Sequence, residues 1–543
     1  MRGNVTITVQ NKQYEVENGM LVAEFIQRLD SDNPIMGVSV DNRVQDLNFL
    51  LTKDCKLDLI DLSSPLGVKI YEKSLLFVLI KAAEIVLPQE ELSIEHSLGG
   101  GIYCEFKGNK RLKKYEVDKI ASIVDKIIKA DLPIRKVTCN KKEAIKKLPQ
   151  KKDLFEYING DSICIYELDG LYGYFNGYIL PNTGYLKQFY LRYYYPGFVL
   201  LYPKTNNQKV VEFEDQKKLF HVFSDYQKWC KFLDVQDVVS LNRKIADNEI
   251  VELIRVAETR HARDLMNISN EIALNPDRAK LIVLAGPSSA GKTTTSKRLA
   301  TNLLVHGLRP VTIELDNYFL DRDKTPKNSR GEYDFDSINA LDIELFNENL
   351  LQLLEYKEVE IPRYNFITGK RERGSKIKIA KENPIIIEGI HGLNEKLTHY
   401  IPKENKYKIY LNALTHLNID SYNRIPTTDI RLIRRLIRDY NTRGHNGIST
   451  LAMWRSVREG EEINIFPYGE EADYIFNSAL LYEISVMRNY ALPILKEVKE
   501  DSPMYIHAER IIGFLELFLP IENTSQILGN SIIREFIGGS IYE

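Results

Sequence analysis

The chain has 543 residues, of which 44% are hydrophobic and 27% are charged, and its formal net charge is −2. This length exceeds what a single hydrophobic core holds, so the sequence predicts several domains. The residue balance is that of an ordinary globular protein, and the near-neutral charge gives no global argument for a nucleic-acid or membrane partner.

The first residues and the cysteines bear on location. Residues 1–4 lead directly into a strand-like alternation and contain no apolar core of a secretion signal. The apolar run 75–80 ends at Lys81, far short of a membrane span. None of the five cysteines forms a C-x-x-C pair, which suits a reducing compartment. We therefore expect a cytoplasmic protein without a membrane partner; the sequence sets no oligomeric state.

Residues 1–62 read as a small mixed domain. Apolar residues at helical spacing predict a short helix at 21–29, after the turn at Asn18 and Gly19. Alternating apolar residues predict four strands, at 5–9, 13–16, 36–40 and 57–62. This order of elements fits a β-grasp-like layout.

Residues 63–215 read as a second, α+β domain. The spacing predicts helices over 75–86 and 117–130, with a strand at 102–106 between them. A basic run extends from Lys107 to Lys119. Such a run is most often a solvated face, and the alternative is a contact with the phosphate backbone of RNA.

Charged helical patterns fill residues 216–278, including a long amphipathic stretch at 252–273, and predict a connector. From Leu281 onward strands and helices alternate, which predicts a parallel α/β sheet. Residues 481–543 read as a helical extension that packs on this sheet domain.

Residues 286–293 have the form G-x-x-x-x-G-K-T, after an apolar strand pattern at 281–285 and before a helical pattern at 294–304. This is the context of a phosphate-binding loop, whose backbone N–H groups and helix N-terminus hold phosphates. Lys292 would reach the outer phosphates and the Thr293 hydroxyl would hold Mg²⁺. The alternative is a plain glycine and serine turn. The residues expected to bind the nucleotide are Gly286, Ser288, Ser289, Ala290, Gly291, Lys292, Thr293 and Thr294.

Two acidic residues follow predicted strands of the same sheet. The strand at 311–315 ends at Asp316, and the apolar run 384–387 ends at Glu388. Ligands of open parallel sheets sit at the carboxyl ends of the strands, so both acids are expected beside the loop. Asp316 could accept a proton from an attacking hydroxyl or help to hold Mg²⁺, and Glu388 would lie near the metal. The alternative for Asp316 is a helix cap.

The segment 429–439 predicts an amphipathic helix with four arginines on one side. Clustered guanidinium groups without matching acids are costly unless an anion arrives, and a transferring phosphoryl group is such an anion. The alternative is a solvated helix whose ends are paired by Asp429 and Asp439. The four are Arg431, Arg434, Arg435 and Arg438.

Residues from about 280 to 480 resemble the uridine kinase and phosphoribulokinase group of P-loop kinases. The resemblance implies transfer of the γ-phosphate of ATP to a sugar hydroxyl. It implies that Asp316 is the general base, that Thr293 and Glu388 organise Mg²⁺, and that Asp342 holds the ribose hydroxyls. Tyr364 and Arg443 would line the nucleoside pocket, and the arginine helix would form the lid. Besides the loop, the matching motifs are 315–319, 333–336, Ala340, Asp342, 362–366, 387–389, 431–439, 443–444 and 472–473.

Two departures leave the acceptor open. Where uridine kinases have a base-contacting histidine this chain has Gly369, and where they have a pocket glutamine it has Met453. A site that lacks its hydrogen-bond partners loses discrimination. The leading hypothesis is an ATP- and Mg²⁺-dependent kinase for the 5′-hydroxyl of uridine or cytidine. The alternatives are a kinase for another small sugar or modified nucleoside, and an RNA-binding regulator that uses a nucleotide as a switch.

The front half resembles the N-terminal part of threonyl-tRNA synthetase, through motifs at 100–106, 130–134 and 180–184. The resemblance implies a TGS domain at 1–62 and an editing domain at 63–215. The positions of the editing histidines and cysteine are Lys73, Phe77, Phe175 and Ile179, which can build no metal or deacylation chemistry. The expected order is therefore a β-grasp TGS-like domain, an editing-like α+β domain without its site, the connector, a P-loop kinase domain at 279–480 with a parallel sheet, and the extension at 481–543.

Overall fold

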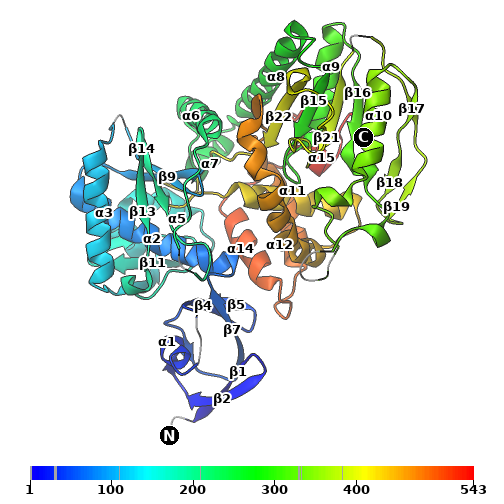
Figure 1. Cartoon of the computed structure of the whole chain (residues 1–543). Helices are drawn as coiled ribbons and strands as arrows, with labels where there is room; N and C mark the ends of the chain where they lie inside the picture. Colours follow the sequence, from blue (N-terminus) through cyan, green and yellow to red (C-terminus); the bar gives the residue numbers. More distant parts are fainter. Residues whose placement is uncertain are drawn as a thin grey trace.

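The computed structural model describes residues 3–29, 33–108, 110–207, 209–327, 331, 333–381 and 383–542. Figure 1 shows three bodies along the chain: a small sheet at the N-terminus, a second module of helices and strands, and a larger module that contains the C-terminus. The chain is thus a multidomain protein with a large α/β part, as the sequence predicts. Within the described residues, every helix falls short of the length and apolarity needed to cross a bilayer.

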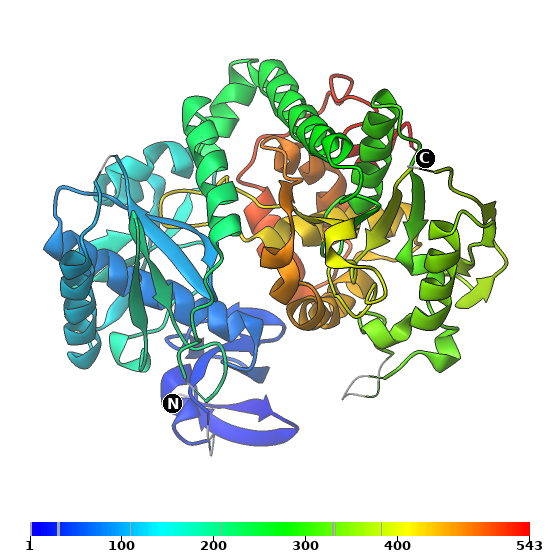
Figure 2. The same cartoon turned by 45° about the horizontal axis from the view of Figure 1, so that its top comes forward.

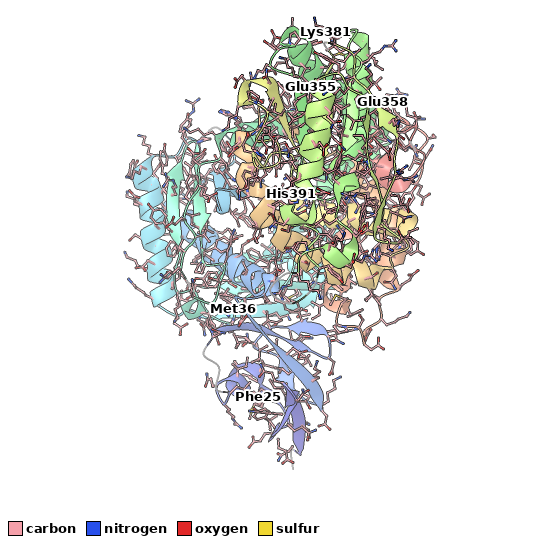
Figure 3. The ribbon with its side chains drawn as sticks, turned by 45° about the vertical axis from the view of Figure 1, so that its right-hand side comes forward. Phe25, Met36, Glu355, Glu358, Lys381 and His391 are labelled. Carbon is pink, nitrogen blue, oxygen red and sulfur yellow. The ribbon has the colours of Figure 1, made fainter. Side chains whose placement is uncertain are left out.

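The N-terminal module is a mixed sheet covered by one short helix. Its elements are β1 (Asn4–Val9), β2 (Lys12–Glu17), β3 (Met20–Leu21), α1 (Val22–Ile26), β4 (Ile35–Val40), β5 (Arg43–Gln45), β6 (Leu50–Leu51) and β7 (Cys55–Asp61). The main sheet has the order β2-β1-β7-β4-β5, and β1 runs parallel to β7. The predicted strands are confirmed, and the helix ends at Ile26 rather than at Leu29. Phe25 lies inside this module, whereas Met36 lies at its junction with the second (Figure 3) and belongs to the core of the second module.

The second module places helices against a four-stranded sheet, β13-β14-β9-β8, and a three-stranded one, β10-β11-β12. Helix α2 begins at Pro65, earlier than the apolar spacing predicts, because Ser64 caps it by accepting the Gly67 N–H. The elements are α2 (Pro65–Val86), β8 (Leu92–Leu98), β9 (Gly101–Phe106), α3 (Lys114–Lys129), β10 (Ile134–Asn140), α4 (Lys141–Lys147), α5 (Lys152–Glu156), β11 (Ser162–Leu168), β12 (Leu171–Gly173), β13 (Tyr190–Tyr194) and β14 (Gly197–Leu201).

Three helices connect this module to the large one: α6 (Lys217–Phe232), α7 (Val238–Ala246) and α8 (Ile250–Leu274). Figure 2 shows the green connecting helices between the two bodies. Helix α8 confirms the amphipathic stretch predicted at 252–273. Its buried face joins the core of the large module, so the connector is part of that core.

The large module is built on a five-stranded sheet of order β16-β21-β15-β22-β23, in which every pairing is parallel. Three of its strands are buried along their whole length, as expected of a parallel sheet covered on both faces. The strands are β15 (Leu281–Ala285), β16 (Val311–Glu314), β21 (Ile385–Gly389), β22 (Lys406–Asn412) and β23 (Tyr474–Asn477).

Helices and two small two-stranded sheets surround this sheet. The helices are α9 (Lys292–Val305), α10 (Ile343–Leu354), α11 (Thr427–Thr442), α12 (Gly447–Asn464), α13 (Glu483–Lys496), α14 (Tyr505–Leu515) and α15 (Arg534–Ile537). The strands of these small sheets are β17 (Val359–Glu360), β18 (Arg363–Asn365), β19 (Lys370–Glu372) and β20 (Lys376–Ile377), of which β18–β19 is a hairpin. The carboxyl ends of the strands, together with α9 and α11, position the candidate site.

Candidate active site

The loop at 286–291 connects β15 to α9, and its Ser288 N–H donates to the Glu461 carboxylate at 3.0 Å. Ser289 and Gly291 both have positive φ, at 58° and 90°, which is the arrangement of an anion-binding nest. Gly286 cannot be larger, because a Cβ there would lie 2.0 Å from the carbonyl oxygen of Leu411. The N-cap of α9 is Gly291, which has no side chain to satisfy the first N–H groups of the helix.

The polar side chains of the loop are only partly engaged by the protein. The Lys292 Nζ lies 3.3 Å from the carbonyl oxygen of Pro287. The Ser289 hydroxyl is buried and has no hydrogen-bond partner within the described part of the chain. Buried polar groups are normally paired, so an unpaired one inside a nest of N–H groups fits a bound phosphate.

Thr293 and Glu388, the two residues predicted to hold the metal, meet beside the loop. The Thr293 Oγ1 lies 3.3 Å from the Glu388 Oε2. Burial raises the pKa of Glu388 to about 8; Lys292 opposes this shift, and Asp316 and Glu314 add to it. A buried carboxylate with acidic neighbours fits a divalent cation, which would compensate its charge.

Asp316 lies at the same edge of the sheet. It follows β16 in a short 3-10 turn at 315–318, and the last residue of β16, Glu314, is the register partner of Glu388 on β21. The Asp316 side chain is partly exposed. Its negative charge raises the pKa of Glu388 further and counteracts the lowering of the Arg443 pKa. The fold therefore brings Lys292, Thr293, Glu388 and Asp316 to one place.

Two of the four predicted lid arginines are instead buried ion-pair partners. Arg431 makes a two-pronged ion pair with Glu461 of α12, and Arg434 pairs with Glu483 of α13 at 2.6 Å. Their side chains are 1% and 0% exposed. The expectation that the cluster lacks matching acids is thus wrong, because the acids come from other helices. Arg431 also donates to the carbonyl oxygen of Ser288, and Arg434 donates to that of Ala290, so both guanidinium groups hold the loop in place.

Arg435 and Arg438 are the arginines that remain partly exposed on α11. Arg435 Nη1 donates to the Ser288 hydroxyl at 2.8 Å, and both arginines share the buried Asp439. Arg443 also lies near Asp439, at 3.8 Å, so three cations surround one carboxylate at the edge of the loop. Burial and the neighbouring Arg438 lower the pKa of Arg443 to about 10, as expected where positive charges crowd.

The acceptor residues named by the resemblance lie around the β18–β19 hairpin. The Tyr364 ring packs 5.1 Å from Phe366, and the Arg443 guanidinium lies 5.6 Å over the same Phe366 ring. Asp342 is already engaged: it caps α10 by accepting the Leu345 N–H and pairs with Arg371 of β19 at 2.7 Å. The structure thus brings Tyr364 and Arg443 together, with Asp342 beside the hairpin.

Gly369, at the position where the resemblance predicts a base-contacting histidine, lies under Arg322. A Cβ on Gly369 would be 2.8 Å from the Arg322 Nε, and its φ of 67° is left-handed. Arg322 also donates to the carbonyl oxygen of Phe366 at 3.0 Å. Arg322, Arg371 and Glu461 were not identified from the sequence, because each acts through a partner distant in the chain.

The positions at which the synthetase resemblance predicts an editing site form a packed core. Phe77, Phe175 and Ile179 are all buried, and the two phenyl rings lie 5.1 Å apart. The Lys73 ammonium donates to the carbonyl oxygen of Asn176. Burial, together with Lys69 and Arg510, lowers the pKa of Lys73 to about 7.

Residues 281–485 match the Phosphoribulokinase / Uridine kinase family. The uridine kinase of Lactobacillus helveticus is 31% identical over 171 residues, which are 31% of this chain and 72% of that protein. The uridine kinase of Staphylococcus aureus is 30% identical over 36% of this chain and 86% of its own length. The chain therefore belongs to the phosphoribulokinase/uridine kinase family, a family of phosphotransferases with an alcohol acceptor.

A second similarity concerns the N-terminal region. The threonine–tRNA ligase of Thermotoga sp. (strain RQ2) is 32% identical over 186 residues, 33% of this chain. The chain spans only 29% of the length of that ligase. Among solved structures, one described as a possible uridine kinase from Bacillus stearothermophilus is 16% identical over 40% of this chain and 98% of its own, with a TM-score of 0.28, too low to add to the assignment.

Proposed function

We propose that the protein is an ATP- and Mg²⁺-dependent nucleoside kinase that phosphorylates the 5′-hydroxyl of a nucleoside, uridine or cytidine before others. The observation that carries this proposal is the approach of the Thr293 hydroxyl to Glu388, 3.3 Å apart beside Lys292, inside the segment that matches the family. A hydroxyl and a carboxylate at the end of a phosphate loop are suitable Mg²⁺ ligands.

The residues divide the work of phosphoryl transfer. Bound ATP and Mg²⁺ would supply the phosphoryl group and neutralise much of its charge. The N–H groups of the loop and of the first turn of α9 would hold the phosphates, with Lys292 at the outer ones. Asp316 would accept the proton of the 5′-hydroxyl. Arg435 and Arg438 would stabilise the charge of the transferring group, while Arg431 and Arg434 keep the loop in place.

The acceptor would lie between the loop and the β18–β19 hairpin. Tyr364 and Arg443 would form one wall, and the Asp342–Arg371 pair would face the sugar hydroxyls. The Tyr364 hydroxyl is buried without a hydrogen-bond partner among the described residues, so it is free to bind an acceptor group.

The test is a panel of nucleosides and small sugars with ATP and Mg²⁺, read by release of ADP. The proposal expects turnover with uridine or cytidine, and no turnover by Lys292→Ala. Within the described part of the chain, Lys292 makes one hydrogen bond, to a loop carbonyl oxygen, so this variant should keep the melting temperature of the natural protein. Release of ADP with none of the nucleosides would overturn the proposal.

A kinase for another small sugar or a modified nucleoside is the second candidate. The Arg322 guanidinium over Gly369 favours it, because a cation fills the space next to the hairpin where the family has a base-contacting histidine. The same panel separates the two candidates, since activity with a sugar and not with uridine or cytidine would select the second.

We further propose that residues 1–62 and 63–215 are a TGS-like and an editing-like module without editing chemistry, joined through a connector at 216–278 to the kinase domain at 279–480 and its extension at 481–543. The packed Phe77 and Phe175 support the loss of the editing site. An RNA-binding role has less support, because Lys107 pairs with Glu91 and Lys110 with Glu116, both at 2.9 Å. Salt-dependent binding of tRNA by the whole chain would restore that role.

A further inference from the structure

The end of the C-terminal extension lies beyond the segment that matches the family, and it packs against the large module. Ile532 and Ile533 are fully buried in the same core as α11. The Arg434 guanidinium lies 5.1 Å over the Phe536 ring, and the Asn441 side chain donates to the carbonyl oxygen of Phe536 at 3.2 Å. The segment 532–536 is therefore packed against α11.

This segment touches the loop itself. A Cβ on Gly291 would lie 2.5 Å from the Ile532 Cγ2, so only glycine allows the extension to approach so closely. Farther along, the Lys297 ammonium on α9 donates to the carbonyl oxygen of Tyr542 at 2.7 Å. The extension thus runs across the start of α9.

Glu535 places a carboxylate on the first turn of that helix. Its Oε2 accepts hydrogen bonds from the Thr294 N–H at 3.1 Å and from the Thr294 hydroxyl at 2.8 Å. Because Gly291 provides no capping side chain, Glu535 acts as the missing cap from 241 residues away. The positive end of a helix attracts an anion, and here the anion is part of the protein.

We propose that Glu535 sets the nucleotide affinity of the site by competing with a phosphate group for Thr294. This inference rests on the proposed function, which needs the same N–H groups for the polyphosphate. Glu314, Asp316 and Glu388 already make this edge of the loop acidic, so an arriving polyphosphate meets Glu535 as a further like charge. The Glu535 side chain is partly exposed, whereas Ile532 and Phe536 are buried. Rotation of that one side chain can free Thr294 without moving the backbone.

The test measures the dissociation constant of Mg²⁺–ATP by calorimetry on the full chain. Glu535→Gln removes the charge and keeps the shape, and we expect it to bind about tenfold more tightly than the natural protein, as removal of one like charge near the phosphates implies. Glu535→Asp keeps the charge on a shorter side chain and should fall between the two. Glu522→Gln removes an exposed charge from the same extension and should leave the dissociation constant unchanged.

Unchanged or weaker binding by a folded Glu535→Gln variant, judged by its melting temperature, would overturn the inference. Weaker binding would mean that Glu535 helps to hold the metal or the nucleotide. If instead the proposed kinase function is wrong, neither the natural protein nor any variant would bind Mg²⁺–ATP. Binding by Glu535→Gln where the natural protein shows none would support the inference strongly.

Discussion

The phosphate loop and the cluster of Lys73, Phe77, Phe175 and Ile179 are two places where a family resemblance predicts a site, and the structure treats them in opposite ways. At the loop, the Ser289 hydroxyl is buried without a partner among the described residues, and Glu388 is buried among other acids. At the other place, two aromatic rings in tilted contact and an isoleucine fill the space. Unpaired buried polar groups cost free energy, so those that gather beside an anion-binding loop fit a ligand that satisfies them.

This contrast separates chemistry from stability. Substitutions at the loop edge should reduce activity and leave the fold intact, because the side chains there have few partners in the protein. Substitutions in the aromatic cluster should do the reverse. A residue that violates this division would identify where the two regions have been assigned wrongly.

The largest effect is expected for Asp316→Asn. The change is isosteric and removes only the ability to take up the proton of the acceptor hydroxyl. General base catalysis contributes about 10²–10⁴-fold to the rate. We expect kcat to fall about 10³-fold, measured as ADP release with the acceptor found in the panel. The melting temperature should not change. Asp323→Asn, an exposed acid on the following turn, is the matched control and should keep full activity. Full activity in Asp316→Asn would remove this residue from the mechanism.

The opposite effect is expected for Phe77→Ala. Truncating a fully buried phenylalanine costs about 3–5 kcal/mol of unfolding free energy, measurable by urea denaturation. Ile85→Ala, on the same helix α2 and half exposed, should cost well under 1 kcal/mol. Neither variant should alter the activity per folded molecule. A specific loss of kinase activity in Phe77→Ala would show that the second module contributes directly to the reaction.

A third comparison lies within helix α11. Arg431→Ala leaves the buried Glu461 without its main partner and should destabilise the fold by about 3–5 kcal/mol. Arg435→Ala removes a partly exposed cation beside Ser288 and should lower kcat about 10²-fold with a smaller loss of stability. Thermal unfolding and initial rates, measured on both variants, test this division. Equal losses of stability would mean that Arg435 is also mainly structural.

These cases show what the sequence could and could not reveal. The phosphate loop, the parallel strands and the acids at their ends are local patterns, since each is written in consecutive residues with a fixed spacing. The partners of Arg431 and Arg434 are not, because Glu461 and Glu483 lie on other helices. The four arginines therefore look equivalent in the sequence, and only packing divides them into buried supports and exposed candidates. Glu535 was missed for the same reason, since its contact with Thr294 is made by the tertiary fold.

The smallest effect concerns Lys73, the one charged member of the aromatic cluster. Its pKa is lowered from 10.5 to about 7, so between these values the folded protein binds fewer protons than the unfolded chain. Unfolding free energy from this group must then rise with pH over that window. Comparing the natural protein with Lys73→Met at pH 7, 8 and 9 by urea denaturation isolates the contribution, and the variant should be less pH-dependent. Equal pH dependence in both proteins would mean that Lys73 keeps an ordinary pKa, and that the cluster is less tightly closed than the packed rings indicate.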